Sequence, residues 1–392
     1  MIKNCLVVVG RMHYPKGSAP ANRSHLYCKA LKQAGGFPVV INLNSPFESP
    51  QSFSHFGVNE GVCYLYSQGS IFREPGFLKR NFNKLKGIVR AFSIIRRLNK
   101  TYNVKMLFFS TSYFYEVIFF LFSRITGIKT IRELNEAPVH ILKGKRQSLL
   151  DKMKERIALK MYDRILVISD KLFNYYLNFF PKEKIFQIPI LVDMERFERS
   201  SAAKKNGKTI LTYVGYMGGN KDGLPDLINS VKLVKNKNEN FILQLVGTAE
   251  PAELAELNDL VNKLQLKEQV FFAGKQDTLA ITSILKNSDV LLLARPDNKQ
   301  AEYGFATKLG EYLASAKPVV VTNTGEIYKY LRHKENAYIA EPGNIQDFSE
   351  KVIDALNDPE RAKKIGHNGY AVANEHFNYK LFKNKMLALM ES

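Results

Sequence analysis

Short apolar segments alternate with amphipathic segments along the whole chain. The apolar segments have the length of strands and are rich in β-branched residues; they are CLVVV, FPVVINL, KMLFF, RILVIS, TILTYVG, FILQLVG, VLLLA and PVVVT. Between most of them apolar residues recur at i, i+3 and i+4, as in residues 224–234 and 254–264. This alternation predicts an α/β fold of parallel sheets covered by helices on both faces.

A polar stretch interrupts the pattern at residues 198–208, ERSSAAKKNGK, and has the composition of a linker. A chain of 392 residues fits two domains of ordinary size. We therefore predict an N-terminal domain over residues 1–200 and a C-terminal domain over residues 201–376. The basic amphipathic segment 377–392 is expected to form a helix that crosses back to the first domain.

Residues 106–128 form the most apolar stretch of the sequence. Glu116 and Arg124 interrupt it, so it predicts a buried strand followed by a buried helix, not a membrane span. The short apolar run near the N-terminus likewise predicts a strand and not a signal peptide. Three scattered cysteines are too few for a disulfide framework or a zinc site, which favours a cytoplasmic protein.

Positive charge is concentrated in the first half of the chain. The net charge is +20; residues 1–200 hold 32 basic and 14 acidic residues, a net +18, and the remainder holds 25 and 23, a net +2. Such asymmetry indicates a polyanionic partner, either nucleic acid or an anionic membrane surface.

Residues 77–100 carry much of this charge and contain no acidic residue. Apolar residues recur there at helical spacing, at Leu78, Phe82, Leu85, Ile88, Val89 and Phe92. The pattern is typical of a helix that lies in an anionic membrane interface. The alternative is a helix that packs on its own sheet with a solvated basic face. We expect membrane contact, at the inner face of the cytoplasmic membrane.

The segment GFATKLGEYLASAKPVVVT, residues 304–322, is the strongest local signal for a ligand site. Its glycine-containing loop leads into a predicted helix that begins near Thr307, and the free N–H groups there, together with Lys308, suit a phosphate. Glu311 could accept hydrogen bonds from ribose hydroxyls. The alternative is a surface ion pair between Lys308 and Glu311.

A second loop, in residues 212–227, follows a predicted strand and opens a helix. Gly215, Gly218 and Gly219 permit close backbone approach, and Lys221 can reach a diphosphate. The loop matches neither the dinucleotide nor the P-loop pattern, and a flexible turn is the alternative reading. Because both loops follow strands of one predicted parallel sheet, they are expected at the edge where such sheets bind ligands.

The loop after the first strand, residues 10–27, is long for a strand-to-helix connection and carries five notable residues: Arg11, Lys16, Gly17, Ser18 and Arg23. Long loops in compact domains are usually functional. We expect this loop to close over a ligand or to meet an anionic acceptor, the alternative being a disordered surface loop.

Together these features resemble the family-4 glycosyltransferases, retaining enzymes of the GT-B fold, over almost the whole chain. The matching segments are PKGSAPANR, NEAP at 135–138, RILVIS at 164–169, IPILVDMERF at 188–197, YVGYMGGNKDG, GFATKLGEYLASAKPVVVT and NAYIAEPGN at 336–344. The resemblance implies two Rossmann-like domains that face a cleft. It also implies transfer of a sugar from a nucleotide-sugar donor to a saccharide or lipid-linked acceptor, in bacterial surface polysaccharide or glycolipid synthesis.

Site residues follow from the resemblance. The implied donor-binding residues are Gly215, Tyr216, Lys221, Phe305, Ala306, Thr307, Lys308 and Glu311, with Glu302 and Lys221 as catalytic residues. The implied acceptor-side residues are Gly17, Ser18, Arg23, Asn135, Glu136 and His140. No cofactor beyond the nucleotide-sugar co-substrate is expected. The sequence has no Asp-x-Asp pair, which favours a metal-independent site in which Lys221 and Lys308 stabilise the departing diphosphate.

The sequence departs from the family pattern at two positions. The family has a Glu, seven residues and a second Glu; Glu311 fits the second, whereas the first falls on Tyr303, with Glu302 one position early. Either residue can take the first role. The family also favours an Arg where this chain has Tyr216, which leaves Lys221 as the matching phosphate-binding cation.

Two other classes of function remain as alternatives. A basic nucleic-acid-binding protein would explain the charge, but the sequence offers no recognised motif, and the excess avoids the second domain. A sugar-nucleotide epimerase or a phosphorylase of the same fold would also bind a related ligand, although the sequence shows no context for a pyridoxal-phosphate lysine.

Overall fold

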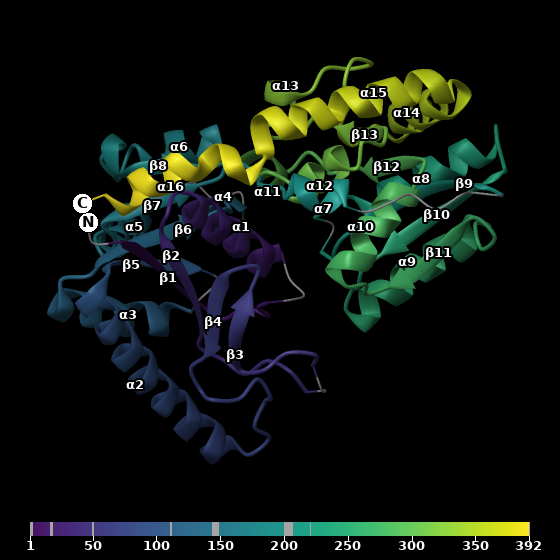
Figure 1. Cartoon of the computed structure of the whole chain (residues 1–392). Coiled ribbons are helices and arrows are strands. Elements are labelled where there is room, and N and C mark those ends of the chain that lie inside the picture. The colour runs from purple at the N-terminus through teal and green to yellow at the C-terminus, as the bar shows by residue number, and fades with distance from the viewer. Residues whose placement is uncertain are drawn as a thin grey trace. The chain divides into compact units, whose positions relative to one another are not determined.

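The computed structural model describes residues 3–15, 19–48, 51–109, 112–142, 149–199, 207–219 and 221–391. It consists of two compact α/β units (Figure 1). The first unit comprises Met1–Asn135, Arg146–Ile188 and Tyr379–Ser392. The second comprises Glu136–Lys145 and Pro189–Asn378.

The first unit is built on an eight-stranded sheet in the order β3-β4-β2-β1-β5-β6-β7-β8. The strands are β1 Asn4–Gly10, β2 Phe37–Asn42, β3 Phe56–Asn59, β4 Val62–Tyr66, β5 Asn103–Phe109, β6 Lys129–Leu134, β7 Arg164–Val167 and β8 Ile185–Gln187. In the middle, Val7 of β1 lies opposite Val39 of β2 and Met106 of β5, all three strands being parallel. Residues 5–9 are fully buried. A strand covered on both faces needs an unbroken apolar run, which is what CLVVV supplies.

One edge of this sheet was not predicted. Strands β3 and β4 form an antiparallel hairpin in which Asn59 pairs with Val62. The two connecting residues, Glu60 and Gly61, both have positive φ, 47° and 80°. This is the conformation of the tight turn that matches the twist of two antiparallel strands. Its sequence signal, a single glycine after an acidic residue, is weak.

Helices cover both faces of the first sheet. They are α1 Ala19–Gln33, α2 Phe77–Thr101, α3 Tyr113–Thr126, α5 Leu149–Leu159, α6 Asp170–Tyr176, η1 Lys182–Lys184, η3 Tyr379–Phe382 and α16 Lys383–Met390. Helix α16 packs on α1 and β1, as Figure 1 also shows, and buries Met386, Leu389 and Met390 completely. The predicted return of the C-terminal helix to the first domain is therefore confirmed.

Residues 106–128 form strand β5 and helix α3, as predicted, but the helix is not buried throughout. Phe119 and Phe122 point into the unit, whereas Phe114, Leu121 and Ile125 on the other face are 56–77% exposed. The prediction of a buried helix was wrong for this face, because α3 has only one side against the sheet. Within the described ranges, no helix has the length and apolar character needed to cross a bilayer.

The second unit contains a six-stranded parallel sheet in the order β11-β10-β9-β12-β13-β14. The strands are β9 Thr209–Val214, β10 Phe241–Val246, β11 Val270–Gly274, β12 Val290–Leu293, β13 Val319–Thr322 and β14 Tyr338–Ala340. The strand order reverses between β9 and β12, which lie side by side with Leu211 opposite Val290. Ligands of such sheets bind beyond the carboxyl ends of the strands at this switch point.

The helices of the second unit are α4 Val139–Leu142, α7 Met194–Glu198, α8 Leu224–Lys235, α9 Pro251–Lys263, α10 Thr278–Asn287, α11 Lys299–Tyr303, α12 Lys308–Ala314, α13 Ile327–Tyr330, α14 Ile345–Asn357, α15 Pro359–Val372 and η2 Ala373–Phe377. The segment that precedes the polar linker already belongs to this unit. The backbone N–H of Val192 donates to the carbonyl of Phe377, and the Lys286 ammonium of α10 donates a hydrogen bond of 2.7 Å to the carbonyl of Phe197. The chain thus enters the second unit after Ile188.

Candidate functional site

The two predicted ligand loops of the second unit meet at the carboxyl ends of β9 and β12. One loop follows β9 from Gly215 to Gly223, and the other follows β12 and leads through α11 to α12. The Lys308 ammonium, in the first turn of α12, lies 3.0 Å from the Tyr213 hydroxyl of β9 and forms an ion pair with Asp222 of the first loop. Parallel strand order therefore brings together residues 86 positions apart in sequence.

Four side chains form a buried charged group at the carboxyl ends of β9 and β12. We call this group the Asp222 cluster; it consists of Tyr213, Asp222, Arg295 and Lys308. Asp222 and Arg295 are each only 5% exposed. Asp222 Oδ2 accepts hydrogen bonds from the Lys308 ammonium and from the Tyr213 hydroxyl, the latter at 2.8 Å. Arg295 Nε lies 3.6 Å from Asp222 Oδ1. Two cations thus share one carboxylate, and the cluster keeps a net positive charge.

Protonation of the Asp222 cluster follows from these contacts. Burial by itself would raise the pKa of Asp222, but Lys308 and Arg295 hold this pKa below its ordinary value. Burial lowers the pKa of Lys308 against the opposing effect of the same carboxylate. The buried Arg295 Nε–H has no hydrogen-bond partner among the described residues. A buried donor without a partner is costly, so this group is available to an acceptor that enters the site.

Gly215 leaves the space that Lys308 occupies. A Cβ atom at this position would lie 2.1 Å from Lys308 Nζ and 2.6 Å from the Tyr213 hydroxyl. Gly223 closes the same loop with a φ of +64°, and a Cβ there would lie 1.9 Å from the carbonyl oxygen of Ala294. Gly223 is therefore required by the close approach of backbone and by its positive φ, whereas a side chain at position 215 would displace the ends of Lys308 and Tyr213.

The tip of the first loop is held by helix α9. The Tyr216 hydroxyl donates to Glu253 Oε2 at 2.8 Å, and the backbone N–H of Gly219 donates to Glu253 Oε1 at 2.7 Å. Glu253 also takes part in the capping box at the start of α9. The tyrosine that replaces the expected Arg is thus attached to a neighbouring carboxylate.

Lys221 pairs with a predicted acceptor-side residue. Its Nζ lies 3.1 Å from Glu136 Oε1, and both side chains are about half exposed. Such an exposed pair contributes little to stability, so a ligand can replace it at low cost.

The remaining predicted donor residues lie near the start of α12. Glu311 pairs with Arg196 at 2.6 Å, while Lys308 pairs with Asp222. The alternative of a simple Lys308–Glu311 surface pair is therefore wrong. Glu302 of α11 pairs with Lys299 at 2.7 Å on the surface.

Three predicted donor residues precede Lys308 in the chain. Phe305 is buried, with its ring stacked on Tyr330 and in edge contact with Phe377, so its side chain packs in the core. Ala306 is also buried, and Thr307 is the N-cap residue of α12.

The predicted acceptor-side residues are only partly described. Gly17 and Ser18 lie outside the described residues, as does the side chain of His140, whose backbone lies in α4. Arg23 is buried in the first unit, where its Nε lies 2.5 Å from Glu133 Oε1, so it has a structural partner. Asn135 Oδ1 is buried without a hydrogen-bond partner among the described residues.

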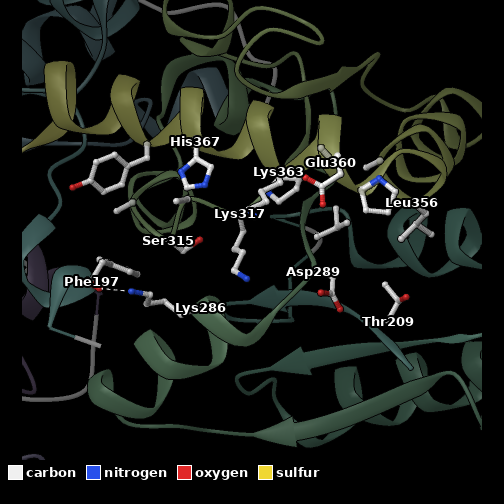
Figure 2. A pocket seen from close by; sticks show the side chains of 18 of the residues that line it. Phe197, Thr209, Lys286, Asp289, Ser315, Lys317, Leu356, Glu360, Lys363 and His367 are labelled. Carbon is white, nitrogen blue, oxygen red and sulfur yellow. Dashed lines mark hydrogen bonds between the residues drawn. The ribbon is translucent and has the colours of Figure 1, made fainter. Parts of the chain in front are cut away.

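A large cavity lies at the amino-terminal ends of the strands of the second sheet, opposite the ends where the two ligand loops meet. It has a volume of about 780 Å³ and is lined by Thr209 and Val290, the first residues of β9 and β12, and by residues of α10 and α15. Figure 2 shows Lys286, Lys317 and Lys363 around it together with Asp289 and Glu360. Because it lies at the amino ends of the strands, this cavity is separate from the Asp222 cluster.

Sequence reasoning missed Asp222 and Arg295. Asp222 directly follows Lys221, and Arg295 follows strand β12, so both stand in positions where site residues occur. Asp222 lies within the matching segment YVGYMGGNKDG but was not singled out there, and its pairing with Arg295 depends on strands that are distant in sequence. Among the described residues, no group of three or more His, Cys, Asp or Glu side chains is placed to hold a metal ion.

Comparison with known sequences finds a family model that matches most of the second unit, and relatives that match one third to two thirds of the chain. Residues 194–372 match the family "Glycosyl transferases group 1". The capsular polysaccharide biosynthesis glycosyltransferase CapM of Staphylococcus aureus is 25% identical over 263 residues, which cover 64% of this chain and 66% of CapM. N-acetyl-alpha-D-glucosaminyl L-malate synthase of Bacillus anthracis is 29% identical over 135 residues, 34% of this chain and 33% of that enzyme. The matches thus span about two thirds and one third of these relatives.

Solved structures with the same fold cover almost the whole chain. Sucrose-phosphate synthase from Thermosynechococcus elongatus matches with a TM-score of 0.73 at 16% identity, over 98% of this chain and 97% of that one. A glycosyltransferase from Rickettsia africae matches at 0.68 and 17%, over 99% and 98%. Anabaena Alr3699/HepE, solved with UDP-glucose, matches at 0.70 and 14%, over 98% of both chains. The predicted fold, two parallel-sheet domains of the GT-B type, is confirmed.

Proposed function

We propose that this chain, whose residues 194–372 match the family "Glycosyl transferases group 1", transfers a sugar from a nucleotide-sugar donor to a glycan or lipid-linked acceptor. The observation that carries this proposal is the Asp222 cluster, a buried and positively charged group at the switch point of the sheet in the matched domain. The names of the relatives support sugar transfer. CapM further supports a role in bacterial surface polysaccharide or glycolipid synthesis.

The chemistry that this cluster suits is departure of a nucleoside diphosphate. Cleavage of the bond between sugar and phosphate leaves negative charge on the phosphate oxygens. Lys308 and Arg295, which share the carboxylate of Asp222, offset this charge in a site shielded from water, where electrostatic interactions are strong. The Arg295 Nε–H, which has no hydrogen-bond partner among the described residues, is a ready donor to a phosphate oxygen. In this proposal Arg295 and Lys308 supply the cation that the family pattern places at Tyr216.

Lys221 completes the phosphate site in this proposal. Its pair with Glu136 is exposed and is exchanged for the diphosphate when the donor binds. The leaving phosphate then accepts the proton of the acceptor hydroxyl, which allows retention without a protein nucleophile. The positive charges of Lys221, Lys308 and Arg295 perform the role that a metal ion has in other transferases, so we propose metal independence.

Glu311 and Glu302 are proposed to contact the sugars. One oxygen of Glu311 accepts from Arg196, and the second oxygen remains able to accept from ribose hydroxyls, since a carboxylate has about four lone-pair sites. Arg196 then fixes the carboxylate in position. Glu302, whose partner Lys299 is on the surface, is proposed to contact the transferred sugar.

A thermal-shift screen with UDP, GDP, ADP, CMP and their sugars tests this function. A ligand that binds only the folded protein at about 100 times its Kd stabilises it by about 2.7 kcal/mol. We expect one nucleotide class to raise Tm, with the effect reduced in Lys221→Ala and in Glu311→Ala. The matched control is Lys351→Ala, which removes an ion pair with Asp347 elsewhere in the second unit.

Several results would contradict the proposal. No stabilisation by any nucleotide would refute it, and unchanged affinity in both site variants would refute the assignment of residues. Conversion of the free nucleotide sugar without an acceptor would indicate an epimerase. Release of nucleoside diphosphate that stops on addition of EDTA would refute metal independence.

A further inference from the structure

Helix α2 of the first unit has two apolar faces, and only one of them is used by the fold. Ile88, Ala91 and Ile95 are buried and attach the helix to its unit. Four other apolar side chains are 62–83% exposed: Leu78, Phe82, Leu85 and Val89. We call these four the apolar stripe. The packing of α2 on its own unit therefore accounts for one face and leaves the other uncovered.

Spacing places the apolar stripe on a single side of α2. Its members are separated by four, three and four residues, and each residue turns an α-helix by about 100°. The stripe therefore lies within a narrow sector, about 90° around the helix from the buried Ile88 and about 150° from the buried Ala91. The first ten residues of this 25-residue helix, before Gly87, include no buried residue. Figure 1 shows α2 at the margin of the first unit.

A row of cations runs directly beside the apolar stripe. Lys79, Lys86, Arg90 and Arg97 are separated by seven, four and seven residues and are exposed, so they occupy the adjacent sector of the helix. The helix contains no acidic residue. The nearest carboxylate paired with this row is Glu74, which lies 3.1 Å from Lys79 Nζ before the helix begins. Apolar and basic rows side by side are the arrangement of a helix that lies flat in a charged interface.

The neighbouring helix extends the exposed apolar surface. Phe92 of α2 stacks on Phe122 of α3, which joins the two helices. On its outer face α3 exposes Phe114, Leu121 and Ile125, which are separated by seven and four residues. Exposed apolar side chains on two helices joined in this way are characteristic of an interaction site.

We propose that α2 docks the protein on an anionic lipid bilayer, with the apolar stripe inserted among the acyl chains and the basic row on the phosphate headgroups. Charge complementarity favours an anionic bilayer as the partner of α2. Residues 1–200 carry a net +18, so the first unit as a whole is attracted to such a surface. A second copy of the chain would bring two basic rows together, which repel. A nucleic acid would use the cations but would leave the phenylalanine and leucine side chains in water.

The chain contains no tryptophan, so Phe82→Trp introduces a single fluorescent reporter into the apolar stripe. We expect its emission to shift to the blue with phosphatidylcholine vesicles that contain phosphatidylglycerol. Brominated acyl chains should quench it, and added salt should reverse the shift. Pure phosphatidylcholine vesicles should give no shift. The matched control is Phe271→Trp, an aromatic position in β11 of the second unit that is 57% exposed against 66% for Phe82, and it should not respond.

Two double variants separate the contributions of the apolar stripe and of the basic row to vesicle binding. Phe82→Ser with Leu85→Ser, and separately Lys86→Gln with Arg90→Gln, should each lower binding to the anionic vesicles about tenfold or more. Lys182→Gln with Lys184→Gln removes the same charge from the exposed segment η1 of the first unit and should change binding little. Both test variants alter exposed side chains, and an unchanged Tm verifies their fold.

Three results would overturn the proposal. The first is absence of the wild-type protein from sedimented anionic vesicles at low salt. The second is a blue shift that rises with protein concentration alone, which identifies a second copy as the occupant. The third is RNA binding that is lost with the basic variant and kept with the serine variant. The membrane surface is independent of the transfer chemistry, so nucleotide-induced Tm shifts distinguish its failure from failure of the proposed function.

Discussion

At the scale of single residues, Asp222 is the group on which two buried cations depend. It accepts from Lys308 and lies 3.6 Å from Arg295, so its removal leaves both charges without a counterion in the protein interior. We expect Asp222→Asn to lower the free energy of unfolding by about 3–5 kcal/mol. Urea denaturation measures this loss, and Asp259→Asn on the exposed face of α9 is the control for loss of a carboxylate.

The free energy of unfolding of Asp222→Asn is expected to depend on bound nucleotide and on pH differently from that of the wild type. A bound nucleotide supplies negative charge, so it should restore more stability to Asp222→Asn than to the wild type. The pKa of Asp222 is lowered in the folded state, so the folded protein binds fewer protons than the unfolded chain. The stability that ionised Asp222 contributes to the folded protein is present above the ordinary pKa of aspartate. It is lost as the pH falls through the pKa that Asp222 has in the folded state. Identical acid-unfolding profiles for wild type and variant would contradict this role.

At the scale of elements, helix α9 controls the loop after β9. Glu253 holds Tyr216 and the N–H of Gly219, and these hydrogen bonds lower its pKa. We expect Glu253→Ala to weaken nucleotide binding severalfold, because the loop that carries Lys221 loses its attachment. Glu253→Gln keeps an acceptor and should recover part of the affinity. Calorimetric titration measures both; equal affinity in wild type and Glu253→Ala would show that the loop is fixed by other contacts.

At the scale of the whole molecule, the C-terminal helix stabilises the N-terminal part of the chain. Met386 and Leu389 of α16 are fully buried in the first unit. We expect Met386→Ala and Leu389→Ala each to lower the free energy of unfolding by about 2–5 kcal/mol, the cost of a cavity in a core. The exposed Leu381→Ala is the matched control.

Hydrogen exchange of the α16 variants reports which unit is affected. Protection should fall first in β1 and α1, which pack on α16. Loss of protection confined to the second unit would contradict the assignment of this helix.

Much of the fold was predictable because the central strands of both sheets are buried on both faces. Such strands need uninterrupted apolar sequence, and VLLL of β12 and VVVT of β13 are accordingly buried at every position. The hairpin of β3 and β4 was missed, since its alternating burial lies at the edge of the sheet. The meeting of the two ligand loops was also predictable, because the carboxyl ends of parallel strands share one edge.

The sequence by itself determined the type and position of most elements, including α2, whose predicted range 77–100 agrees with Phe77–Thr101. Side-chain periodicity reports whether a position faces water or protein, and this is a local property. Only the tertiary structure decided which face of α2 is buried, and which residues surround Lys308. Those facts depend on the order of strands in the sheet, which brings Asp222 and Arg295 to Lys308 across long stretches of chain. Periodicity carries no information about pairing at that distance.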